Sequence, residues 1–85
     1  MQHRKTNSFR KAFEALPLET RQLADKSFQL LKANPKHPSL HFKRVPAGWS
    51  ARVGIHHRAL AVERTYGFLW YWIGSHADYG RGIRG

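Results

Sequence analysis

Residues 68–80 of the chain read FLWYWIGSHADYG. Their first half, Phe68–Ile73, is apolar at every position, which predicts a strand that is buried on both faces. The polar side chains of His76, Asp78 and Tyr79 follow almost directly. A core strand that leads into three groups able to hold or transfer protons is either a plain strand end with polar loop residues or the edge of a functional site.

Three other candidate strands precede this one. They are the alternation of Leu40 and Phe42 that starts at Pro38, the alternation of Trp49, Ala51 and Val53 with polar residues, and the run Ala59, Leu60, Ala61 and Val62. Turn residues near positions 54–56 and 66–67 leave only short connections, so we expect an antiparallel meander. Trp49 and Trp72 are expected to be buried, structural side chains.

The region before the strands has the period of helices. We expect one helix between Ser8, a suitable N-cap, and Pro17, which cannot continue a helix. Its apolar stripe comprises Phe9, Ala12, Phe13 and Leu16. A second helix is expected from Glu19 or Thr20 to the Asn-Pro step at residues 34–35. Its predicted buried face comprises Leu23, Ala24, Phe28, Leu30 and Leu31.

Both stripes are buried at once if the two helices lie across one face of the antiparallel sheet. That arrangement is an α+β fold. The 85 residues suffice for one domain, residues 1–85, and a domain of this size buries about 60–65% of the surface of its unfolded chain. Residues 1–7 are polar and basic, and form either a short edge strand or a loose arm.

The charge of the chain indicates the kind of partner. Fifteen Lys and Arg stand against five Asp and Glu, which gives a formal net charge of +10. Such an excess favours a polyanion, with nucleic acid as the first candidate and an acidic protein as the second. A membrane surface is a poor third candidate, because the basic residues are spread along the chain instead of lying on one amphipathic helix.

The sequence also indicates a compartment. It has no cysteine, so disulfides and thiolate metal sites are excluded. It has no apolar run near the ~20 residues of a membrane span, and its charged start lacks the apolar core of a signal peptide. We therefore expect a cytoplasmic protein with no membrane association.

The residues best suited to chemistry are Arg52, Arg58 and His76. A meander places their strands side by side, so the three side chains could converge on the uncovered sheet face. Two guanidiniums stabilise the charge that grows on a phosphate during phosphodiester cleavage, and a histidine transfers the proton. Strict alternation puts Arg58 in phase with Leu60 and Val62, which a bulge or a rim position would reconcile. The alternative is two solvated arginines and a loop histidine.

Other polar side chains are expected near this group. Asp78 and Tyr79 are placed to orient the ring of His76, to donate a hydrogen bond or to stack on a base. His56 and His57 fall on a hairpin turn, where a contact with RNA is conceivable. No histidine pair with a helical spacing and a carboxylate is present, and no glycine-rich phosphate loop, so we expect neither a metal nor a cofactor.

The order and spacing of these segments resemble the RelE/ParE superfamily of toxins from bacterial toxin–antitoxin systems. The resemblance runs from about Ser8 to Tyr79, and its most specific parts are RVGIHHRAL at residues 52–60 and IGSHADY at residues 73–79. It implies a small, curved antiparallel sheet backed by two N-terminal helices. It also implies an acidic antitoxin whose segments wrap and neutralise the toxin.

The ribonuclease branch of that superfamily (RelE-, HigB- and YafQ-like) cuts messenger RNA without a metal, usually in the ribosomal decoding site. By this resemblance, Arg52 stands at a basic position of the central strand and Arg58 at the arginine that stabilises the attacked phosphate. His76 and Tyr79 match the C-terminal histidine and aromatic residue, and Lys43 is a secondary phosphate contact. Further contacts with the nucleic acid are expected from Arg44, His56, His57 and Asp78.

Two readings remain beside this one. The superfamily also contains toxins that inhibit DNA gyrase and cut nothing. A basic RNA-binding module in which His76 is only structural is the other. The sequence differs from some ribonuclease relatives at Ser50, where they carry a second lysine, and at residues 80–85, which are basic and glycine-rich.

Overall fold

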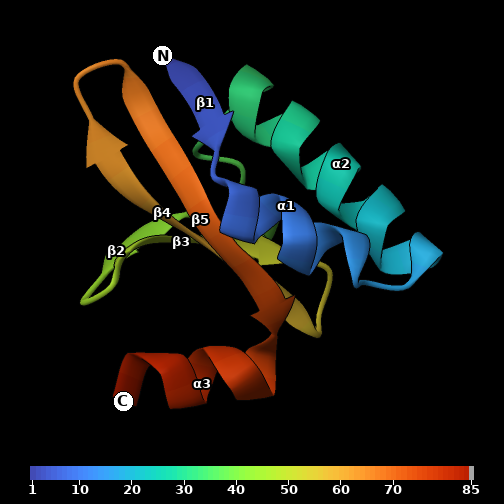
Figure 1. Ribbon diagram of the computed structural model, residues 1–85. Coiled ribbons are helices and arrows are strands. Elements are labelled where there is room, and N and C mark those ends of the chain that lie inside the picture. Colours follow the sequence, from blue (N-terminus) through green and yellow to red (C-terminus); the bar gives the residue numbers. More distant parts are fainter. Residues whose placement is uncertain (85) are drawn as a thin grey trace.

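A computed structural model of the chain describes residues 1–84, with side chains as far as residue 80. Two helices lie on one side of a five-stranded sheet, and a third helix lies apart from them at the end of the last strand (Figure 1). The strands are β1 (Gln2–Lys5), β2 (Lys43–Val45), β3 (Gly48–Val53), β4 (His57–Arg64) and β5 (Gly67–Ser75). The helices are α1 (Asn7–Glu14), α2 (Leu18–Ala33) and α3 (His76–Arg84), with one 3₁₀ turn at Pro38–Leu40.

The sheet confirms the predicted α+β fold and adds one parallel strand. Its order is β1-β5-β4-β3-β2, and β2 to β5 form the expected antiparallel meander. β1 is the edge strand, and it pairs with β5 in parallel. Short turns force neighbouring strands to pair in antiparallel fashion. Most of the chain lies between β1 and β5 in sequence, so no short turn fixes the direction in which they pair. The sheet is therefore mixed and not wholly antiparallel.

The helix starts differ from the predicted ones. Thr6, not Ser8, caps α1, and its Oγ1 accepts a 3.0 Å hydrogen bond from the backbone N–H of Phe9. α2 starts directly after Pro17, earlier than expected, because proline suits the start of a helix. Asn34 ends α2 as predicted.

The core lies between the sheet and the helices α1 and α2. Trp70 of β5 is fully buried, and its ring meets that of Phe28 of α2 edge to face at 5.1 Å. Leu23 was predicted to be buried but is 45% exposed, because α2 turns Ala24, Phe28 and Leu31 to the sheet instead. The predicted strand from Pro38 is also wrong, since a 3₁₀ turn occupies its start and pairing begins only at β2.

A β-bulge decides which side chains of β5 face the core. Leu60 of β4 pairs with Trp72, and the next residue, Ala61, pairs with Trp70, so Tyr71 is the extra residue. Trp70 therefore points to the helices, while Trp72 points to the open face of the sheet with Leu60. The expectation that Trp72 is a core side chain is wrong.

Arg58 lies on the open face because Leu60 lies there too. The side chains that β4 turns to the helices are the small ones of Ala59 and Ala61, which are 1% and 0% exposed. Neither a bulge at Arg58 nor a rim position is needed. The predicted alternation of side chains along β4 is therefore correct, but the face assigned to Leu60 was wrong, because Leu60 points to the open side of the sheet.

Candidate active site

Arg58 is a buried cation with an unmet donor. Only 8% of its surface is exposed. Its Nε donates a 2.8 Å hydrogen bond to Oγ of the fully buried Ser50, and its Cζ lies 5.1 Å from the centre of the Tyr79 ring. Its Nη2 is buried and has no hydrogen-bond partner among the described residues. Because an unsatisfied buried charge is costly, this geometry suits an anion that completes it.

Arg52 on β3 stands directly opposite Arg58 on β4. Its Nε donates to the carbonyl oxygen of Gly54 at 2.9 Å, and its Nη1 lies 3.4 Å from Nε2 of His41. Like charges directly opposite one another on neighbouring strands destabilise a sheet. A phosphate would offset this repulsion and accept hydrogen bonds from the forked donors of both side chains.

His76 and Tyr79 lie in the first turn of α3, not in a loop. Oγ of Ser75 accepts a 3.1 Å hydrogen bond from the backbone N–H of Asp78, as an N-cap does. The backbone N–H of His76 donates to the carbonyl oxygen of His56 at 2.7 Å, which ties the start of the helix to the β3–β4 turn. Their spacing puts His76 and Tyr79 on one helix face, where their rings stack at 5.8 Å.

A hollow of about 200 Å³ opens between these groups. Its lining residues are His41, Arg52, Ile55, His57, Arg58 and His76. Four of them were predicted site residues, and Tyr79 borders the hollow through its contact with Arg58. His41 and Ile55 were missed. His41 reaches the hollow from a left-handed turn with φ of 43°, for which the alternating pattern has no signal.

The hollow contains two further imidazoles besides that of His41. Burial, and secondly the neighbouring His56, lower the pKa of His57 below its usual value of 6.5. Its ring is therefore neutral at neutral pH and can accept a proton. His76, the first residue of α3, is exposed and lines the same hollow. The site thus holds more than one group that can take or give a proton.

The other predicted contacts lie at several places relative to this hollow. Lys43 pairs with Ser50 and shares the open face, whereas the next residue, Arg44, points to the opposite face. His56 is exposed in the turn, and Asp78 lines a second hollow further along the open face. The structure thus places Arg44 on the far face of the sheet, away from the group.

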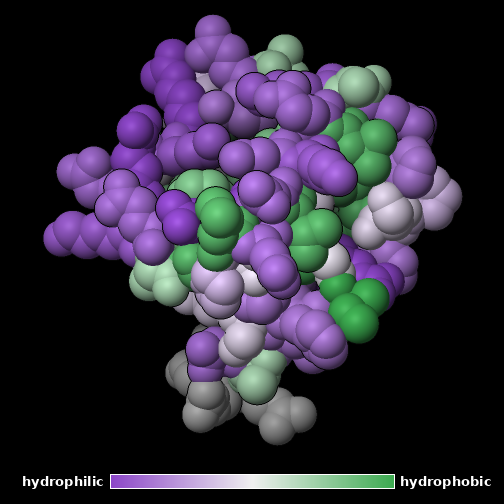
Figure 2. Space-filling view, turned by 90° about the vertical axis from the view of Figure 1, so that its right-hand side faces the viewer, coloured by the Kyte–Doolittle hydropathy of each residue, from purple (hydrophilic) through white to green (hydrophobic). Residues whose placement is uncertain are grey.

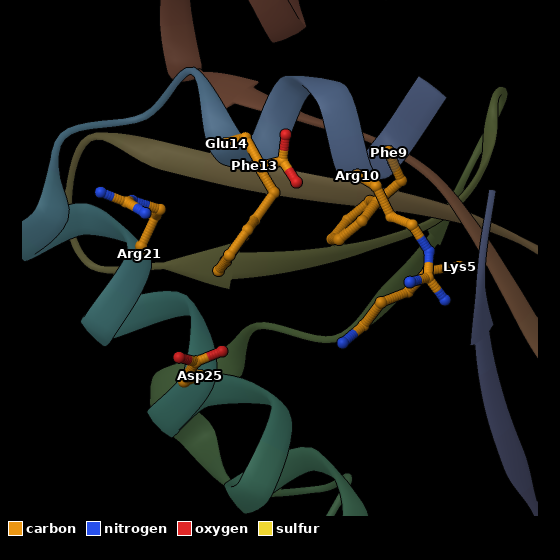
Figure 3. A pocket seen from close by; sticks show the side chains of 7 residues that line it. All are labelled: Lys5, Phe9, Arg10, Phe13, Glu14, Arg21 and Asp25. Carbon is orange, nitrogen blue, oxygen red and sulfur yellow. The ribbon is translucent and has the colours of Figure 1, made fainter. Parts of the chain in front are cut away.

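A larger hollow lies elsewhere, between β1, α1 and α2, and measures about 410 Å³ (Figure 3). It is lined by Lys5, Phe9, Arg10, Phe13, Glu14, Arg21 and Asp25. Burial, and secondly the charge of Lys32, lower the pKa of Lys5. Since two carboxylates stand among the cations, this hollow matches a polyanion less well than the one at Arg58.

Further observations concern the rest of the described surface. The side of the molecule seen in Figure 2 is mostly hydrophilic, with apolar areas between the polar side chains. No described helix is long and apolar enough to cross a membrane. Within the part of the chain that the structure describes, no three His, Asp or Glu side chains gather as metal ligands.

Comparisons with known proteins show that the fold is shared with solved structures of an antitoxin–toxin complex and of a toxin. No protein-family model matches the sequence, and a search of curated proteins finds no relative. Two solved structures share the architecture over almost the whole chain. The predicted RelE-like fold is therefore confirmed.

The first of these structures is the RelB–RelE antitoxin–toxin complex from Methanococcus jannaschii. One of its chains superposes with a TM-score of 0.72 and 11% identity, over 94% of this chain and 98% of that one. The second is a copper-bound mutant toxin from Helicobacter pylori, with a TM-score of 0.72 and 15% identity, over 92% of this chain and 97% of that one. At such identities the likeness concerns the fold alone.

Proposed function

We propose that this protein is the toxin of a toxin–antitoxin system and that it cleaves messenger RNA without a metal, on the ribosome. The observation that carries the proposal is the buried guanidinium of Arg58, whose Nη2 has no described partner and which stands opposite Arg52. The RelE-like fold supports the toxin part of the proposal. The net charge of +10 supports a polyanionic substrate.

The proposed reaction uses only the chain's own side chains. The 2′-hydroxyl of one nucleotide attacks the neighbouring phosphorus while an imidazole of the hollow accepts its proton. The bond from phosphorus to the 5′-oxygen breaks, that oxygen takes up a proton, and a 2′,3′-cyclic phosphate remains. Arg58 and Arg52 stabilise the negative charge that builds on the phosphoryl oxygens. Ser50 accepts a hydrogen bond from Nε of Arg58, which limits the orientations of its guanidinium.

The proposed antitoxin is a small acidic protein. The likeness to a chain of an antitoxin–toxin complex supports such a partner, and an acidic chain complements the surplus of ten positive charges. Its binding would relieve the self-repulsion of the free toxin.

Induced expression in bacteria tests this function. Wild-type protein should arrest growth and create new RNA ends inside coding sequences, and the acidic protein encoded next to it should restore growth. The Arg58→Ala variant should neither arrest growth nor create new RNA ends. Arg44→Ala, which removes the same charge from the opposite sheet face, should behave as wild type. Inhibition of DNA supercoiling without new RNA ends would show a gyrase-inhibiting toxin. Unimpaired growth with folded protein would overturn the toxin proposal.

A further inference from the structure

Lys5 of β1 extends into the hollow of about 410 Å³ between β1, α1 and α2 (Figure 3). This hollow lies on the side of the sheet that carries α1 and α2, away from the arginine pair on the open face (Figure 1). Lys5 is exposed, so a small reagent can reach it from solvent. The proposed cleavage of RNA uses none of the side chains that line this hollow.

The amine of Lys5 is placed to act as a nucleophile. Its Nζ lies 4.9 Å from the centre of the Phe28 ring, whose apolar face displaces part of the water around the ammonium. Burial, and secondly the charge of Lys32, lower the pKa of Lys5, and Arg10 adds to the shift. Asp25 opposes the shift but acts more weakly than Lys32. Because the neutral amine is the nucleophilic form, a lysine in these surroundings reacts faster than an ordinary surface lysine.

Cations next to this amine can hold an anionic reagent. Arg10 lies beside Lys5 in Figure 3, and Lys32 is close enough to repel the charge of Lys5. Arg21 and Glu14 lie toward the other end of the hollow in the same view. A dianionic group that enters beside Lys5 therefore meets an arginine and a lysine, and it offsets the repulsion between the three cations.

We propose that Lys5 is a covalent modification site, whose Nζ is acylated by an acyl phosphate bound in this hollow. The neutral amine attacks the carbonyl carbon and a C–N bond forms. The bond from that carbon to the phosphate oxygen breaks, and inorganic phosphate leaves with the electron pair and with the proton that the nitrogen loses. Arg10 and Lys32 hold the phosphate and stabilise the charge that develops on it. The ring of Phe9 lines the hollow as an apolar wall for the acyl group.

The inference does not depend on the proposed cleavage of RNA. Acylation converts the ammonium into a neutral amide and lowers the formal net charge of +10 by one. It also removes the repulsion of Lys5 by Lys32 and Arg10. The modified chain thus carries less charge toward a polyanionic partner, while its arginine pair on the open face is unchanged.

Acetylation of the purified protein by acetyl phosphate tests the site. After incubation at increasing reagent concentrations and digestion with chymotrypsin, mass spectrometry gives the rate of acetylation at each lysine. The rate at Lys5 should saturate with the reagent, and inorganic phosphate should inhibit it competitively. Lys36, which is exposed in the turn after α2, should react more slowly, at a rate that rises linearly with the reagent and is unaffected by phosphate.

Two results with wild-type protein would overturn the proposal. One is acetylation of Lys5 and Lys36 at equal rates. The other is a rate at Lys5 that rises linearly with the reagent and does not respond to phosphate, since a lysine that is merely reactive would behave in that way. Both readouts use the unaltered chain, so they do not depend on whether a variant folds.

Matched arginine variants test the proposed phosphate contact. Arg10→Ala and Arg44→Ala each remove one exposed arginine, and only the first lies at the hollow. At low reagent concentration, Arg10→Ala should slow the acetylation of Lys5 by about 10- to 100-fold, the loss expected for a hydrogen bond between charged groups. Arg44→Ala should leave the rate unchanged. An equal rate at Lys5 in both variants would contradict the role of Arg10 in holding the phosphate.

Discussion

The hydrogen bond between Ser50 and Arg58 offers the sharpest test of how the site is built. Ser50→Ala removes the acceptor of a 2.8 Å bond from Nε of a guanidinium that is 8% exposed. Nη2 already lacks a described partner, so the variant leaves a second donor of the same cation unmet. A hydrogen bond to a charged group contributes about 1.5–3 kcal/mol, and the loss should be of that size.

That loss is large for this chain. A domain of 85 residues has an unfolding free energy of about 4–13 kcal/mol. At ~4–8 °C per kcal/mol, Ser50→Ala should lower Tm by ~6–24 °C. Thermal and urea unfolding followed by circular dichroism measure the change.

A double-variant cycle tests the cause. Arg58→Met removes the buried charge, so the Ser50→Ala and Arg58→Met changes together should restore most of the stability that Ser50→Ala loses. Phosphate should raise the Tm of wild type and leave that of Arg58→Met unchanged. A Ser50→Ala variant as stable as wild type, or losses that simply add, would refute the account of Arg58 as a buried cation with an unmet donor.

Three further predictions concern catalysis and pH. In single-turnover assays on a ribosome-bound message, Arg58→Ala should lose most of the cleavage, and Arg58→Lys should recover only part of it because an ammonium lacks the forked donors. His76→Ala should lower the cleavage rate by a factor of ~10²–10⁴. Wild-type rates in both alanine variants would place the chemistry elsewhere. Cleavage should persist in excess EDTA, because the arginines supply the positive charge; activity that vanishes with chelator and returns with a divalent ion would contradict the mechanism. The unfolding free energy should fall as the pH falls through about 6.5, because burial lowers the pKa of His57 and the unfolded chain takes up that proton first. The His57→Gln variant should show a weaker dependence of stability on pH. The same pH dependence in His57→Gln and in wild type would count against the burial of the ring.

The sequence predicted the meander and the helix pair because both depend on local signals. Short turns force antiparallel neighbours, and Pro17 and Asn34 mark helix boundaries wherever the helices pack. The parallel pairing of β1 with β5 joins residues 2 and 67, and nothing local indicates such a contact. The C-terminal helix was missed because glycines at 80 and 82 disfavour helix, although Ser75 and Asp78 have the spacing of a capping box.

The candidate site was predicted in its members but not in its details. Arg52, Arg58 and His76 line one hollow, as expected from neighbouring strands. The orientation of Trp72 could not be predicted, because β5 is apolar on both faces and a bulge at Tyr71 leaves no mark on such a pattern. A buried serine that holds an arginine is likewise a property of packing, which alternation alone does not reveal.

The most direct test of the central claim is the chemistry at the RNA ends. Purified protein should be incubated with programmed ribosomes, with Arg44→Ala and Arg58→Ala as the matched pair of variants, and the ends of the message identified. We expect a 2′,3′-cyclic phosphate and a 5′-hydroxyl from wild type and Arg44→Ala, and none from Arg58→Ala. A single 2′-deoxy substitution at the cleaved nucleotide should abolish the reaction. Intact message with folded wild-type protein, or cleavage that survives the 2′-deoxy substitution, would contradict the account.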